Sequence, residues 1–251
     1  MKATIPIAFG LSAGMAAAAY LKFARPRVLN WGATKAEVER SMPGDEILAD
    51  ASLETTRVIT IDAPPDCVWP WLVQMGPRPR AGAYTYDWIE RLLGIDIQNT
   101  NRILDEYQKL EAGEFLNLND KGQGILVRGV QAERFLVLQW MPAESTWVFG
   151  LYPEDGGQRA QNRQAKSLTR VVTRLVSRNR LRGSGPLFQL GMTAFMEPGS
   201  LIMERKMLLG IKERAERLCR EREGPAPGDA SSREAPAPPG RRADQRPIAP
   251  D

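Results

Sequence analysis

Histidine is absent from this 251-residue chain, and its absence excludes a wide range of chemistry. There can be no Ser-His-Asp triad, no Cys-His nucleophile pair, no HExxH zinc motif and no imidazole to shuttle protons near neutral pH. Cysteine is nearly as scarce, since Cys67 and Cys219 are far apart and form no C-x-x-C pair. Neither a zinc site nor a disulfide framework is indicated, so we expect two structural free thiols and no metal or cofactor.

A strong excess of one charge is also lacking. The chain has 34 Lys and Arg against 30 Asp and Glu, and the two signs are interleaved. A dedicated nucleic-acid binder concentrates its basic residues on one face, so nucleic acid is not an expected partner. The apolar fraction of 43% and the charged fraction of 25% are ordinary for a globular protein with a real core.

The most informative stretch passes from a strand pattern into a short helix. Alternating β-forming residues predict a strand over 53–62. A helix is predicted over 65–75, because four apolar residues fall on one helical face: Val68, Trp71, Leu72 and Met75. A second helix is predicted over 84–93, where the sequence begins Tyr-Thr-Tyr-Asp-Trp.

The remainder of the chain predicts an antiparallel sheet followed by helix. Short β-forming runs predict strands at 102–104, 114–118, 124–131, 134–140, 146–153 and 167–177. The last helical region is predicted to divide at Pro198, because proline suits the first turn of a helix and not its interior. One apolar stripe follows on its second part: Met203, Met207, Leu208, Ile211, Ala215 and Leu218.

These features together resemble the START-like superfamily, also called SRPBCC or polyketide cyclase/dehydrase-like. The resemblance is carried by the strand-helix junction, by residues 84–88 and by the helix over 203–216, and it runs from about Asn30 to Arg220. It implies an α+β helix-grip fold, in which an antiparallel sheet curves around a long C-terminal helix and leaves an apolar cavity. Members bind lipids, sterols or polyketides and a few catalyse cyclisation, so the resemblance implies a pocket more than a reaction.

Four segments are expected along the chain. Residues 1–23 form a membrane anchor or signal segment, residues 24–52 a connector with a short helix, residues 53–222 the helix-grip domain, and residues 223–251 a disordered tail rich in Pro, Ala and Gly. In the connector, Thr34 followed by Glu37 predicts a capping box.

The first segment contains an uncharged run over residues 3–21, which is close to the ~20 residues that a membrane-spanning helix needs. Ala17, Ala18 and Ala19 leave a cleaved signal peptide open as the alternative, in which case the protein would be exported. For an anchor, the basic residues after the run slightly outnumber those before it, which places the domain in the cytoplasm by the positive-inside rule.

Large apolar side chains at alternating strand positions are the candidate ligand contacts. On the concave face of a curved sheet they would line a cavity or fill a plain core. The cluster over 84–88 is expected at the cavity mouth, or else caps the second helix. The expected ligand-binding residues are Trp71, Tyr84, Tyr86, Asp87, Trp88, Leu138, Trp140, Trp147, Phe149, Met203 and Met207.

A row of arginines is the last notable pattern. Arg170, Arg174, Arg178, Arg180 and Arg182 occur with no acid between them. We expect a solvated sheet face there, with a basic edge against anionic headgroups as the alternative.

The leading hypothesis is a membrane-anchored protein that binds a hydrophobic small molecule or lipid without transforming it. The first alternative is a cyclase or dehydratase-like enzyme acting on a polyketide-like substrate. Its acid-base chemistry would fall to Asp87, Glu90, Asp96 or Glu197, and no spacing marks two of them as a pair. The second alternative is a scaffold whose core is filled and which recruits a partner protein.

Overall fold

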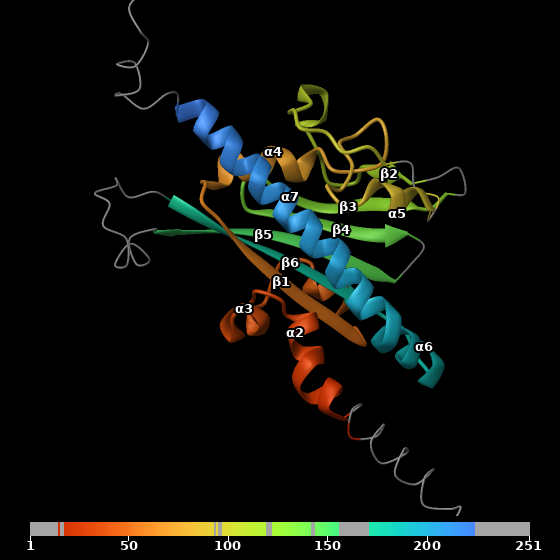
Figure 1. Ribbon diagram of the computed structural model, residues 1–251. Helices are drawn as coiled ribbons and strands as arrows, with labels where there is room; N and C mark the ends of the chain where they lie inside the picture. The colour runs from red at the N-terminus through yellow and green to blue at the C-terminus, as the bar shows by residue number, and fades with distance from the viewer. Residues whose placement is uncertain are drawn as a thin grey trace, which may run out of the picture.

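A six-stranded antiparallel sheet forms the centre of the protein, and one long helix lies diagonally across its concave face (Figure 1). The computed structural model describes residues 15, 18–92, 94, 97–118, 122–141, 144–155 and 171–223. The strands are β1 (Leu53–Ile61), β2 (Phe115–Asn117), β3 (Gly124–Gln131), β4 (Phe135–Met141), β5 (Ser145–Asp155) and β6 (Val171–Leu181). Their order across the sheet is β1-β6-β5-β4-β3-β2, so the first strand pairs with the last.

The helices lie on both faces of this sheet. They are η1 (Tyr20–Ala24), α2 (Arg25–Leu29), α3 (Lys35–Glu39), η2 (Asp45–Leu48), α4 (Pro65–Val73), α5 (Asp87–Leu92), η3 (Asp105–Tyr107), α6 (Pro186–Gly191), η6 (Met192–Met196) and α7 (Glu197–Glu223). The expected helix-grip architecture is confirmed, because α7 is the long C-terminal helix that the sheet curves around (Figure 1).

Two prolines sit in helices at places where the missing N–H is accommodated. Pro198 directly follows the wider π-helical turn η6, and the backbone stays helical from Pro186 to Glu223, so Pro198 marks a change of helix type and not the predicted start of a separate helix. Pro70 lies inside α4, where it cannot donate to the carbonyl of Asp66. Arg222 on α7 donates to that carbonyl over 3.3 Å, so the orphaned acceptor has a partner.

The main core lies between the concave face, α4 and α7. Period-2 alternation sends Phe149 and Leu175 toward the helices, and the apolar stripe of α7 supplies Leu208 and Ile211; all four are fully buried. Each fully buried side chain of this size contributes roughly 1.5–3 kcal/mol to folding. The grip of the sheet on the helix is therefore a hydrophobic contact.

The opposite, convex face is covered by the segment that precedes β1. A second cluster of buried residues lies there: Met42, Val58, Val137, Val148 and Val176. Gly44 allows the close approach, because its φ is +93° and a Cβ in its place would lie 2.5 Å from Val137 Cγ1. The predicted capping box is confirmed, since Glu37 N donates to Thr34 Oγ1 and Thr34 N donates to Glu37 Oε2.

This cover changes the interpretation of the arginine row. Arg174 lies 2.7 Å from Glu37 Oε2, and Arg178 lies 2.8 Å from Asp45 Oδ2. Both guanidinium groups are buried, so the expectation of a solvated or headgroup-facing row is wrong for these two residues. Acids of α3 and η2, far away in the sequence, compensate their charge.

Several predicted boundaries differ from the structure. Residues 102–104 form no strand and lead into η3. The second helix begins at Asp87 and not at 84, because Tyr84 has a φ of +57°, which no right-handed helix contains. The last strand ends at Leu181, four residues beyond its predicted end, and the predicted residues 167–170 lie outside the described ranges. Residues 224–251 of the expected tail lie outside the described residues.

Within the described ranges, no helix is both long and apolar enough to cross a bilayer. Residues 3–14, 16 and 17 of the uncharged run lie outside those ranges.

Candidate ligand cavity

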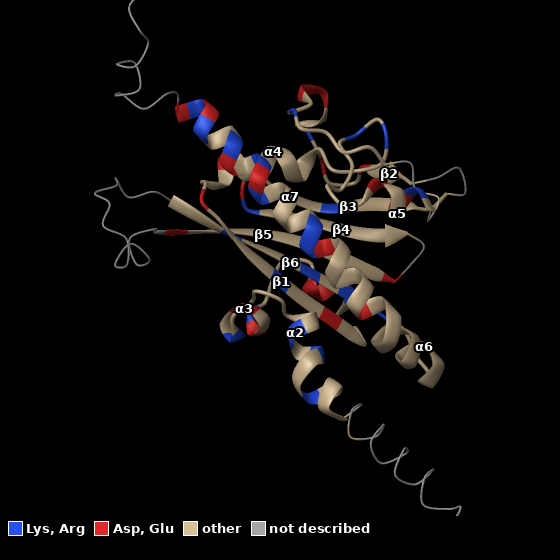
Figure 2. Ribbon diagram, viewed as in Figure 1, with Lys and Arg blue, Asp and Glu red and all other residues tan. Residues whose placement is uncertain are grey.

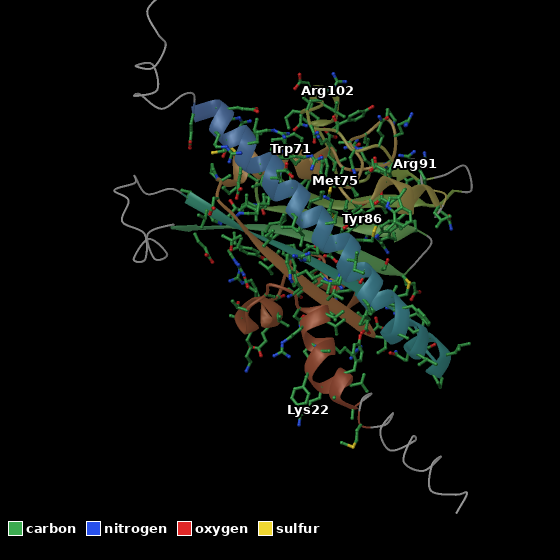
Figure 3. All side chains as sticks on the ribbon, viewed as in Figure 1. Lys22, Trp71, Met75, Tyr86, Arg91 and Arg102 are labelled. Carbon is green, nitrogen blue, oxygen red and sulfur yellow. The ribbon has the colours of Figure 1, made fainter. Side chains whose placement is uncertain are left out.

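A cavity of about 430 Å³ lies between the concave face of the sheet and the helical layer. Its walls come from all six strands, from α4 and the loop after it, and from α5, η6 and α7. Most lining side chains are apolar, including Met75, Leu116, Ile125, Leu136 and Met192. Figure 3 shows Met75 and Trp71 on the helical side of the core, near α7.

Five of the eleven predicted ligand-binding residues line this cavity. They are Leu138, Trp140, Trp147, Met203 and Met207. The two tryptophans lie on the neighbouring strands β4 and β5, and their rings stack with centroids 6.4 Å apart and planes 18° apart. This places a flat aromatic surface opposite the two flexible methionine side chains of α7.

Three of the other predicted residues are core and structural groups. Phe149 is fully buried and packs in the core without lining the cavity. Trp71 and Tyr84 make an edge-to-face contact, with ring centroids 6.1 Å apart. The Tyr84 hydroxyl donates to the Trp71 carbonyl and accepts from Gln74 Nε2, both over 3.0 Å. Burial raises the pKa of Tyr84, which keeps the phenol neutral.

The 84–88 cluster is held by Asn99, and of its five residues only Thr85 lines the cavity. Asn99 accepts from the Tyr84 amide over 2.6 Å and donates to the Thr85 carbonyl and to Asp87, which begins α5. Trp88 is 67% exposed. Tyr86 lies beside α7, where Lys206 Nζ is 5.9 Å from its ring centroid (Figure 3). Neither Tyr86 nor Trp88 lines the cavity.

A polar group in the cavity wall was missed by the sequence analysis. Arg57 on β1 donates to Glu204 on α7 and, over 2.9 Å, to Ser200 Oγ. Glu204 also accepts from Ser177 over 2.6 Å and from Asn179 over 3.2 Å. Burial raises the pKa of Glu204, while Arg57 and its other donors act in the opposite direction.

A signal for this pair was present in the sequence. Arg57 shares its strand face with Ile59 and Ile61, and Glu204 precedes Leu208 by one helical turn on the buried stripe. Opposite charges at core positions of two different elements predict a buried ion pair if the elements meet. That they meet depends on the tertiary fold.

Glu90 on α5 is a second polar group of the wall. It is 6% exposed, and Thr85 Oγ1 donates to its Oε1. Its Oε2 has no hydrogen-bond partner among the described residues. Burial raises the pKa of Glu90, the nearby Asp87 acts in the same direction, and the Thr85 hydrogen bond opposes them. Thr55 Oγ1, also in the wall, likewise lacks a partner within the described part.

In the part of the chain that the structure describes, no three His, Cys, Asp or Glu side chains lie close enough together to coordinate a metal ion. Cys67 and Cys219 are buried free thiols where α4 meets α7. Burial, with the neighbouring Cys219, raises the pKa of Cys67 to about 12. The cavity therefore offers apolar surface, a compensated ion pair and one incompletely bonded carboxyl group.

No protein-family model and no curated protein matches the sequence. Solved structures with a similar fold include an aromatase/cyclase from Streptomyces sp. R1128, with 16% identity and a TM-score of 0.34 over 68% of this chain and 98% of that chain. A Polyketide_cyc-like protein from Corynebacterium glutamicum has 12% identity and a TM-score of 0.28 over 68% of this chain and 91% of that one. A Mesorhizobium loti protein has 18% identity and a TM-score of 0.31 over 64% and 97%. At these values the similarities carry no functional argument, and the helix-grip architecture rests on the strand order and on α7.

Proposed function

We propose that this protein binds a hydrophobic small molecule or lipid in the cavity, and that residues 3–21 hold it at a membrane. The cavity itself carries the proposal. At about 430 Å³ and with mostly apolar walls, it falls within the range of roughly 300–1,000 Å³ that is typical of small-molecule sites. It also disfavours the scaffold alternative, which required a filled core.

The polar groups of the wall favour a neutral ligand. Arg57 is already engaged by Glu204, Ser200 and the carbonyl oxygens of Val28 and Glu197. An anionic headgroup would have to displace one of these partners. Glu90, by contrast, has an oxygen available, and in its protonated form it would donate a hydrogen bond to a carbonyl or hydroxyl oxygen of the ligand.

Native mass spectrometry of the full-length protein, extracted in detergent and exposed to a lipid extract of its own cells, tests this function. We expect an apolar molecule to remain bound. Met203→Trp should displace it, because Met203 lines the cavity. Ile202→Trp is the matched control, since Ile202 is the next residue and is 58% exposed. If wild type and control both retain no apolar molecule, the proposal is wrong.

A second candidate function is a cyclase or dehydratase-like enzyme, and Glu90 is the observation that favours it. A buried carboxyl group with a raised pKa can act as a general acid in the dehydration of a β-hydroxy ketone. It protonates the hydroxyl group, which leaves as water, while the α-carbon gives up its proton to solvent and the C=C bond forms. Incubation with a β-hydroxy ketone mimic of a cyclised polyketide would then give a dehydrated product in wild type. Glu90→Gln should abolish the turnover and retain binding. If the protein only binds its ligand, neither wild type nor the variant gives a product.

A further inference from the structure

The end of the molecule formed by η1, α6 and η6 exposes an unusual amount of apolar surface. Large apolar side chains there are between 52% and 83% exposed: Leu21, Phe23, Leu187, Leu190, Phe195 and Met196. We call these six residues the apolar end. Large exposed apolar side chains gathered at one end of a folded protein are a candidate interaction site.

The two segments that contribute the apolar end are held side by side. Tyr20 Oη donates to the Thr193 carbonyl over 3.3 Å, and Arg25 makes a two-pronged ion pair with Glu197 at 2.8 and 2.9 Å. The chain before Tyr20, which is uncharged from Ala3 onward, therefore joins the fold at this end.

Charge distinguishes a bilayer from other occupants of this surface. Residues 18–36 and 183–196, which include η1, α6 and η6, contain no Asp or Glu, and residues 183–196 contain no charged side chain at all. Figure 2 shows α6 in tan alone. Lys22 and Arg27 are exposed beside the apolar end. Apolar side chains flanked by exposed basic ones are complementary to an anionic membrane interface. The exposed acids Asp50 and Glu144, near the start of α6, are paired with Arg182.

The cavity reaches the same end. Met192 and Met196 of η6 line the cavity, and Met196 is also 57% exposed. We propose that the apolar end docks on an anionic lipid bilayer and that the ligand passes between bilayer and cavity beside Met192 and Met196. The route of the ligand rests on the proposed binding function, whereas the docking does not.

The docking is tested on the full-length chain in vesicles of equal parts phosphatidylcholine and phosphatidylglycerol. A Phe195→Cys variant carrying a fluorescent label should be quenched by lipids with a shallow doxyl group, and a Gln131→Cys variant labelled in the same way should not. Leu190→Glu should weaken the quenching about tenfold. It removes apolar area that would be buried in the bilayer, and it adds a negative charge that the anionic lipid repels. Leu92→Glu is the matched control, as Leu92 is an 80% exposed leucine on α5.

This readout needs no ligand, so it separates docking from binding. Weaker quenching in phosphatidylcholine alone would support the charge argument. A label at residue 195 that stays exposed to water in both lipids would overturn the proposal. The proposal would also be wrong if the label is shielded from water in detergent and the protein there has twice the mass of one chain. The apolar end would then be the contact with a second copy of the chain.

Discussion

Arg57 and Glu204 form an ion pair inside the wall of the cavity, with side chains only 1% and 7% exposed. Arg57 belongs to the first strand and Glu204 to the last helix, so the pair joins the two ends of the fold. Ser177 and Asn179 on β6 complete the hydrogen bonds of the carboxylate. The wall therefore contains two opposite charges that compensate each other by direct contact.

Removing one partner of this pair should be costly. Glu204→Ala leaves the Arg57 charge buried without its acid, so we expect the free energy of unfolding to fall by about 3–5 kcal/mol. The double variant Arg57→Met/Glu204→Leu should regain most of that loss, because no charge is left behind. Urea denaturation measures both, and a Glu204→Ala variant as stable as wild type would contradict the prediction.

Trp147 and Phe149 allow a matched comparison on one strand. Phe149 is fully buried in the core, so Phe149→Ala should cost about 3–5 kcal/mol of unfolding free energy. Trp147 lines the cavity and donates to Ser177 over 2.8 Å, so Trp147→Ala enlarges existing space. We expect a clearly smaller loss of stability for Trp147→Ala, together with weaker retention of an apolar ligand. Equal losses with unchanged ligand retention would show that Trp147 is ordinary core.

Glu90 should make stability fall as pH rises. Its pKa is raised in the folded protein above the ordinary value of 4.5, so the folded state holds a proton that the unfolded state releases. The stabilisation is complete below pH 4.5 and is lost as pH climbs through the raised pKa. Glu90→Gln should flatten this part of the curve of unfolding free energy against pH. Glu221→Gln, on an exposed side chain, should leave the slope as in wild type.

The Cys67 thiol should be unreactive in the folded protein. Its pKa of about 12 leaves almost no thiolate at pH 8, and its side chain is buried. We expect alkylation by iodoacetamide to be far slower in the native protein than in urea, as measured by mass spectrometry. Modification of native Cys67 at the rate of a free cysteine would show that α4 and α7 separate readily.

The secondary structure was largely accessible from the sequence because its causes are local. The capping box at Thr34 and Glu37 and the alternation in β1 and β5 each follow from residues within a few positions. The helix predicted from Tyr84 failed because that residue adopts a positive φ, held by the hydrogen bonds of its hydroxyl and amide to Trp71, Gln74 and Asn99.

The site was only partly accessible. Alternation identified Leu138, Trp140 and Trp147 as facing one side of a sheet, and these residues line the cavity. It predicted the same for Phe149, which packs in the core instead. Whether a concave-facing side chain borders space or packs against another depends on the helix opposite it. No periodicity within one strand contains that information.

The sequence by itself determined most of the strands and the amphipathic stripe of α7, because hydrophobic periodicity and capping act between neighbours in the chain. The grip of the sheet on that helix was implied by the family resemblance and not by any local pattern. Tertiary structure alone decided that Arg174 and Arg178 are buried under residues 35–48, that Arg57 meets Glu204, and that Glu90 Oε2 is buried in the cavity wall. Those outcomes depend on which distant segments exclude water from a charge. Desolvation is a property of the assembled fold and not of any local pattern.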